Sequence, residues 1–158
     1  MANINDFRDF DAFKACRGFS REIGFLVRSA PLRQNRRLFD QMERAAISVL
    51  SNFAEGAERD GNAEFIHFLT ICKGSIGELR AQLIYCLDIE LIDQAKYKSL
   101  DEMAGSASKP VGGLVRYLKT SGRSGRKFED RVRPKRKQKR ARTRKARLRN
   151  PQLATSNP

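Results

Sequence analysis

The chain has 158 residues, of which 32 are Lys or Arg and 18 are Asp or Glu, so its formal net charge is +14. Residues 1–122 hold 17 basic and 16 acidic side chains, whereas residues 123–158 hold 15 basic and 2 acidic ones. We therefore predict one near-neutral folded domain over residues 1–122, a length that suits one core and is too short for two. The tail over residues 123–158 is too poor in apolar residues to offset the entropy of ordering, so we expect it to be disordered when alone. The excess positive charge therefore belongs to the tail and not to the folded domain. It indicates that the tail has an anionic partner.

The remaining counts exclude a secreted or membrane-spanning protein. Cys16, Cys72 and Cys86 are odd in number and contain no CxxC pair. Cys72 and Cys86 would lie about 21 Å apart along a helix, far beyond disulfide reach. The first residues lack the apolar region of a signal peptide, and no apolar run approaches the ~20 residues that span a bilayer. We expect a cytoplasmic protein whose cysteines are reduced and buried.

Apolar residues at i, i+3 and i+4 spacing predict two helices in the first half of the chain, over residues 9–29 and 36–57. The first should end at Ala30-Pro31, because a residue before proline is pushed out of the helical region. The second should end at Gly56 or in the turn at residues 60–62.

A third helix, capped by Asp60 or Gly61, is the most strongly patterned segment. Its heptad-like apolar stripe is Phe65, Leu69, Cys72, Ile76, Leu79, Leu83 and Cys86. A second apolar stripe lies beside it, made of Phe68, Ile71, Ile84 and Leu87. A helix that is apolar on more than one face is expected to contact more than one neighbour.

The fourth helix is predicted to begin at Asp93, a good N-cap, and to reach Leu118. Pro110 removes a backbone hydrogen bond, so we expect a kink there or a break near Ser108. A flexible linker is predicted over residues 120–125. Short connections between long helices make neighbours antiparallel, so the predicted fold is an all-α, up-down-up-down four-helix bundle.

Two motifs resemble a known bacterial family. Residues 44–56 read RAAISVLSNFAEG and residues 64–83 read EFIHFLTICKGSIGELRAQL. They are similar to the RRAAxSIPSNIAEG and EFxxFLxIAxGSxxELxTQL of the four-helix-bundle proteins encoded in intervening sequences of 23S rRNA genes. The opening at residues 7–13 also resembles the family's F-x-D-L-x-V-W. The resemblance implies a homo-oligomeric ring, five-fold in known examples, with no established catalysis. The accessory protein of diversity-generating retroelements, which is basic and binds nucleic acid and a reverse transcriptase, is a more distant likeness.

The chain departs from the family pattern at three positions and at its end. Leu50 stands where the family has proline, so the second helix is expected to run straighter, and Phe13 stands where it has tryptophan. Pro110 and the glycines around it weaken the fourth helix. The basic extension after Gly122 has no counterpart in the family, so the resemblance implies nothing about it.

The motifs supply candidate contact residues. Asn52, Glu55 and Arg59 share one helix face, and Glu55 and Arg59 are spaced as a favourable i, i+4 pair. We interpret this face as a contact that positions a neighbouring helix or subunit, with a capped, solvated helix end as the alternative. The predicted contact residues are Asn52, Glu55, Gly56, Gly74, Ser75 and Glu78.

No pattern predicts an enzyme, a metal site or a cofactor. The sequence has no GxSxG and no phosphate-binding glycine loop. Glu64 and His67 form an ExxH motif of the kind that holds di-iron centres in bundles, but such a centre needs a second motif. His67 is the one histidine in the chain, so only a site shared between subunits remains as an alternative.

The tail carries the best functional signal. Dense arginine neutralises phosphates and makes bidentate contacts, which predicts binding to nucleic acid, with RNA favoured over DNA and no strong sequence preference. The alternatives are a solvated appendage, an anionic membrane, or a bundle that recruits a protein such as a polymerase. The membrane is disfavoured because the tail has no apolar face. The predicted nucleic-acid-binding residues are Arg131, Arg133, Lys135, Arg136, Lys137, Lys139, Arg140, Arg142, Arg144, Lys145, Arg147 and Arg149.

Overall fold

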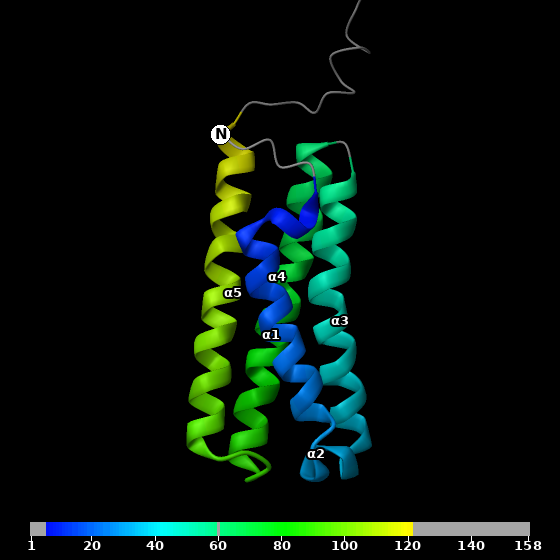
Figure 1. The fold of residues 1–158 in the computed structure, drawn as a ribbon, viewed down its shortest axis with the longest axis vertical. Helices are drawn as coiled ribbons and strands as arrows, with labels where there is room; N and C mark the ends of the chain where they lie inside the picture. The colour runs from blue at the N-terminus through cyan, green and yellow to red at the C-terminus, as the bar shows by residue number, and fades with distance from the viewer. Residues whose placement is uncertain (1–5, 60, 122–158) are drawn as a thin grey trace, which may run out of the picture. The chain divides into compact units, whose positions relative to one another are not determined.

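A computed structural model describes residues 6–59 and 61–121, and every element in those two ranges is helical. The elements in chain order are a 3₁₀ turn (Phe7–Asp9), α1 (Asp11–Val27), α2 (Ala30–Gln34), α3 (Arg36–Glu58), α4 (Asn62–Asp88) and α5 (Gln94–Thr120). The four long helices lie side by side, and the short α2 lies at one end of them (Figure 1). The predicted all-α four-helix bundle is confirmed.

Each long helix packs against two others. α3 packs against α1 and α4, and α5 packs against α1 and α4. The connections are short, since α3 ends at Glu58 and α4 begins at Asn62, while α4 ends at Asp88 and α5 begins at Gln94. Consecutive long helices therefore run antiparallel (Figure 1). α3 and α4 also pack against each other.

The heptad-like stripe predicted for the third helix forms the centre of the core. All of its members, from Phe65 to Cys86, are buried in α4. The second stripe is divided: Phe68 and Leu87 are half-buried, whereas Ile71 and Ile84 are exposed. One face of α4 thus packs within the chain, and part of its second apolar face reaches solvent.

Phenylalanine rings fill the end of the core where the 3₁₀ turn packs against α1 and α3. Phe13 and Phe53 are buried with ring centroids 5.4 Å apart, and Phe53 and Phe65 are 5.9 Å apart. Phe7 meets Phe13 edge to face at 4.9 Å. Phe13 therefore takes the place of the family's tryptophan inside a cluster of rings, where edge-to-face contacts add to apolar burial.

Two predictions about proline need correction. Pro31 was expected to end the first helix, but α1 already ends at Val27, and residues Ala30–Gln34 form the unpredicted α2. Proline is tolerated there because a helix has no intrahelical acceptors for the N–H groups of its first turn. Pro31 therefore helps to start a short helix.

Pro110 does not break the fourth helix. α5 runs from Gln94 to Thr120 as one helix, so the break predicted near Ser108 is wrong. The carbonyl that loses its donor belongs to Ser106, four residues earlier, and Ser106 is exposed to water, which can take the place of that donor. The predicted cap is confirmed, because the Asp93 side chain accepts a hydrogen bond of 2.7 Å from the backbone N–H of Lys96.

Candidate functional site

The predicted contact residues lie on the two helices that pack together, α3 and α4. We call this surface the α3/α4 seam and define it by Ser48, Asn52, Glu55, Gly56, Ile71, Gly74, Ser75, Glu78, Gln82 and Tyr85. It includes all six residues that the motifs suggested. The sequence motifs thus converge on one pair of antiparallel helices.

A chain of hydrogen bonds crosses the seam. The Asn52 side-chain amide donates to the Ser48 carbonyl at 2.8 Å and to the Ser48 hydroxyl at 3.0 Å. The Ser48 and Ser75 hydroxyl oxygens are 2.8 Å apart, and the Ser75 hydroxyl donates to the Ile71 carbonyl at 3.2 Å. One consistent direction runs from Asn52 through Ser48 and Ser75 to Ile71. The bond between Ser48 and Ser75, supported by Asn52, therefore helps to fix the register between α3 and α4.

Gly56 lies where α3 and the first turns of α4 approach each other closely. It is buried, and a Cβ atom on it would lie 2.7 Å from Phe68 Cβ and 2.9 Å from Phe65 Cδ2. A side chain of any size would push the two helices apart. Gly74 differs, because it is exposed and a Cβ atom there would meet nothing within 4 Å. A role for Gly74 in contact with another subunit stays a prediction.

Arg59 joins the end of α3 to the start of α4. Its guanidinium lies 2.6 Å from Glu55 Oε1 and 3.1 Å from Glu64 Oε1, and it sits 4.9 Å from the centre of the Phe68 ring. Hydrogen bonds to these two carboxylates raise the pKa of Arg59. The three charged groups are about half exposed, so water screens both pairs and neither adds much to the stability of the fold.

The ExxH motif has other partners in this structure. The Glu64 carboxylate is engaged by Arg59, and the His67 ring contacts Phe68, with ring centroids 5.5 Å apart. Within the described ranges, no three His, Cys, Asp or Glu side chains are grouped to hold a metal ion. A site shared between subunits stays untested. Glu78, the remaining acidic residue of the seam, accepts a hydrogen bond of 3.1 Å from Gln82.

Apolar side chains are exposed next to these polar contacts. Ile71 is 38% exposed and Tyr85 is 52% exposed, and both belong to α4. Tyr85 borders an open groove of about 520 Å³ between α3 and α4, which is lined by Asn35, Arg37, Leu38, Gln41, Glu78, Ala81, Gln82 and Tyr85. The groove extends the seam toward the start of α3, and sequence reasoning missed the α3 residues that line it.

The three cysteines lie in the core as free thiols, as predicted. A hydrogen bond with Cys16 and burial raise the pKa of the Cys72 thiol far above its usual range. Burial raises the pKa of Cys86 from 9.0 to about 11. Thiolates are the reactive form of cysteine, so both thiols are protected from reaction at neutral pH.

The predicted tail residues, from Arg131 to Arg149, lie outside the described residues, as does the linker beyond Ser121. Sequence reasoning missed a second basic feature, a hollow lined by Arg28, Arg33 and Arg36. None of the described helices has the length and apolar character needed to cross a membrane.

The bundle and its seam define a small helical protein in which the recognisable motifs hold two helices in register. The model of the family described as 23S rRNA-intervening sequence protein matches residues 8–113. The chain therefore belongs to this family, as its motifs indicated. The match ends within α5, before the basic tail. A search of curated proteins found no match.

Proposed function

We propose that this chain is a non-enzymatic, homo-oligomeric bundle protein of the cytoplasm that binds nucleic acid through its basic tail. The observation that carries the proposal is the charge of residues 123–158, which hold 15 basic and 2 acidic side chains beside an almost neutral domain. Such a segment binds phosphates by releasing their counterions, with little dependence on sequence.

Two observations favour RNA over DNA. Arginine predominates in the tail, and its planar guanidinium makes bidentate contacts with phosphate and stacks on unpaired bases. The family description refers to 23S rRNA. The likeness to the retroelement accessory protein agrees with a nucleic-acid partner and stays a prediction.

The α3/α4 seam supports the homo-oligomeric part of the proposal. Ile71 and Tyr85 are exposed apolar groups on a helix whose other face is fully packed, and the exposed Gly74 between them would admit a close approach. The family resemblance implies a ring, five-fold in known examples. A ring gathers several tails, which raises affinity without new contacts.

The tail is tested in the full-length chain by changing its twelve predicted binding residues to glutamine. We expect the affinity for a labelled RNA to fall steeply, because the phosphate contacts are lost. For the same reason, the slope of the logarithm of the association constant, log K, against log salt concentration should become shallower. Fluorescence anisotropy at several salt concentrations measures both. Circular dichroism should report the same helix content as the wild type. Wild-type affinity and salt dependence in this variant would rule out the tail as the binding segment.

A protein-interaction scaffold is the second candidate, in which the bundle recruits a partner such as a polymerase. The exposed groove beside Tyr85 is the observation in its favour. A partner that binds the glutamine-tail variant but not a Tyr85→Glu variant would support the scaffold. A partner that binds the Tyr85→Glu variant but not the glutamine-tail variant would support binding through the tail, as proposed for nucleic acid.

A further inference from the structure

The near-neutral charge of the bundle conceals a separation of charge along it. Residues 17–44 contain seven arginines, no lysine and three carboxylates, whereas the other described residues contain ten basic and twelve acidic side chains. Residues 17–44 include most of α1, the short α2 and the first nine residues of α3. Arginine is therefore concentrated on one part of the bundle. These arginines are additional to the basic residues of the tail.

These elements enclose an open hollow of about 660 Å³, which we call the arginine pocket. It is lined by Arg28, Arg33, Arg36, Phe39 and Asp40, and its volume falls in the range of ligand sites. Arg28 is held in place, because its guanidinium lies 2.9 Å from Glu43 Oε1 and donates to the Gly24 carbonyl at 2.7 Å. Glu43 thus offsets the charge of Arg28.

The two other arginines keep their charge available. Among the described residues, no carboxylate forms an ion pair with Arg33 or Arg36, although Asp40 lines the same pocket. Both side chains are exposed. Two guanidinium groups beside an apolar ring, that of Phe39, suit a phosphate with an attached sugar and base.

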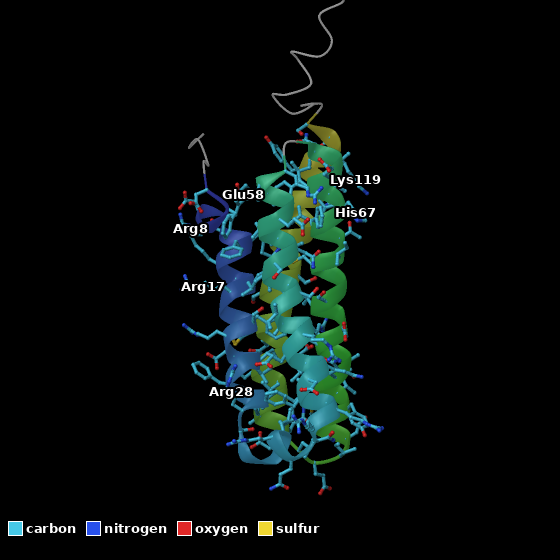
Figure 2. The ribbon with its side chains drawn as sticks, turned by 90° about the vertical axis from the view of Figure 1, so that its right-hand side faces the viewer. Arg8, Arg17, Arg28, Glu58, His67 and Lys119 are labelled. Carbon is cyan, nitrogen blue, oxygen red and sulfur yellow. The ribbon has the colours of Figure 1, made fainter. Side chains whose placement is uncertain are left out.

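An exposed aromatic ring lies on α1, three residues before Arg28 of the pocket. Arg17, Arg21, Phe25 and Arg28 follow each other at spacings of four, four and three residues, so they share one face of the helix. Phe25 is 63% exposed and is the most exposed large apolar side chain among the described residues. Figure 2 shows Arg17 and Arg28 along this side of α1, with Arg28 near the end of the bundle opposite to Glu58 and His67. Phe25 is therefore a free stacking surface between two cations.

We propose that the arginine pocket binds the phosphodiester backbone of single-stranded nucleic acid through Arg33 and Arg36, with a base stacked on Phe25. This inference deepens the proposed function, on which its choice of partner rests, by giving the bundle a contact of its own. Bidentate contact with phosphate explains why the cations are arginine, and stacking explains the exposed ring. Because Asp40 offsets part of the charge, the pocket is a weak site that acts together with the tail.

The experiment compares full-length variants in their binding to short labelled oligouridylate and oligothymidylate. Arg33→Gln with Arg36→Gln removes two phosphate contacts and should lower the slope of log K against log salt by about 1.4 for a single strand. Lys98→Gln with Lys109→Gln, two exposed positions on α5, removes the same charge and should leave the slope unchanged. Phe25→Ala should weaken single-strand binding about five-fold or more and leave duplex binding unchanged.

The outcomes separate this inference from the tail. If the arginine variant behaves as the lysine control does, the pocket is overturned, whatever the glutamine-tail variant shows. If the glutamine-tail variant binds as the wild type does while the arginine variant loses binding, the result supports binding by the arginine pocket and rejects binding by the tail. Loss of binding to phosphatidylserine vesicles alone would reassign the pocket to a membrane. Phe25, Arg33, Arg36, Lys98 and Lys109 are all exposed, so thermal unfolding should be unchanged by their substitution.

Discussion

Gly56 is a motif residue whose role is steric, because its lack of a side chain lets α3 and α4 approach each other closely. Gly56→Ala should destabilise the bundle by about 1–3 kcal/mol, because the new methyl group would lie 2.7 Å from Phe68 Cβ. Gly105→Ala is the matched control, since nothing lies within 4 Å of a Cβ atom there, and it should stabilise α5 by about 0.5–1 kcal/mol. Urea unfolding followed by circular dichroism measures both. Equal effects of the two substitutions would contradict the close approach at Gly56.

The buried thiol of Cys86 couples stability to alkaline pH. Its pKa is raised from 9.0 to about 11 in the folded chain, so between these values the unfolded state has released a proton that the folded state keeps. The resulting stability is complete below pH 9 and declines as the pH rises to 11, by at most about 1.4 kcal/mol per pH unit. Cys86→Ala should therefore show a shallower decline of the unfolding free energy over this range.

The control for this titration is Met42→Leu. The Met42 sulfur lies 4.0 Å from the Cys86 sulfur, so the change alters the same contact without removing a proton. The unfolding free energy, measured in urea at several pH values, should decline with pH in this variant as it does in the wild type. Equal slopes for Cys86→Ala and the wild type would show that the thiol does not titrate as described.

At the scale of the helices, Pro110 lowers the free energy of unfolding without breaking α5. Pro110→Ala restores a donor for the Ser106 carbonyl and should raise the unfolding free energy by about 1–2 kcal/mol, since proline also limits the entropy of the unfolded chain. Lys109→Ala, at the neighbouring exposed position, should change it by less than about 0.5 kcal/mol. A loss of stability in the Pro110→Ala variant would mean that the packing of the proline ring stabilises the fold more than the restored hydrogen bond does.

The elements differ in how well the sequence predicted them. The stripe from Phe65 to Cys86 and the cap at Asp93 were predictable, because helical spacing and capping chemistry are local. The five-residue α2 was not, because a helix this short has too few residues for a periodic pattern. The arginine pocket escaped because it forms only when two connections fold Arg28 back beside Arg33 and Arg36. The seam residues were recognised from the family motifs, and the structure supplied their hydrogen bonds.

At the scale of the whole molecule, the proposed homo-oligomer would link the α3/α4 seam to the tail. If the seam joins subunits, Ile71→Glu with Tyr85→Glu places charges in an apolar contact and should reduce the mass measured by sedimentation velocity to that of one chain. Phe25→Glu, at a more exposed apolar residue on α1, should leave the mass unchanged.

The same seam variant should also bind a long RNA more weakly, by about 10²–10⁴-fold, although every tail residue is present. The reason is that a lone chain offers one tail, whereas an assembly holds several at a high effective concentration near the same strand. A short oligouridylate that spans one tail should be bound with similar affinity by the seam variant and the wild type. If the seam variant loses mass but keeps its affinity for long RNA, then the tails act independently, and assembly serves a purpose other than avidity.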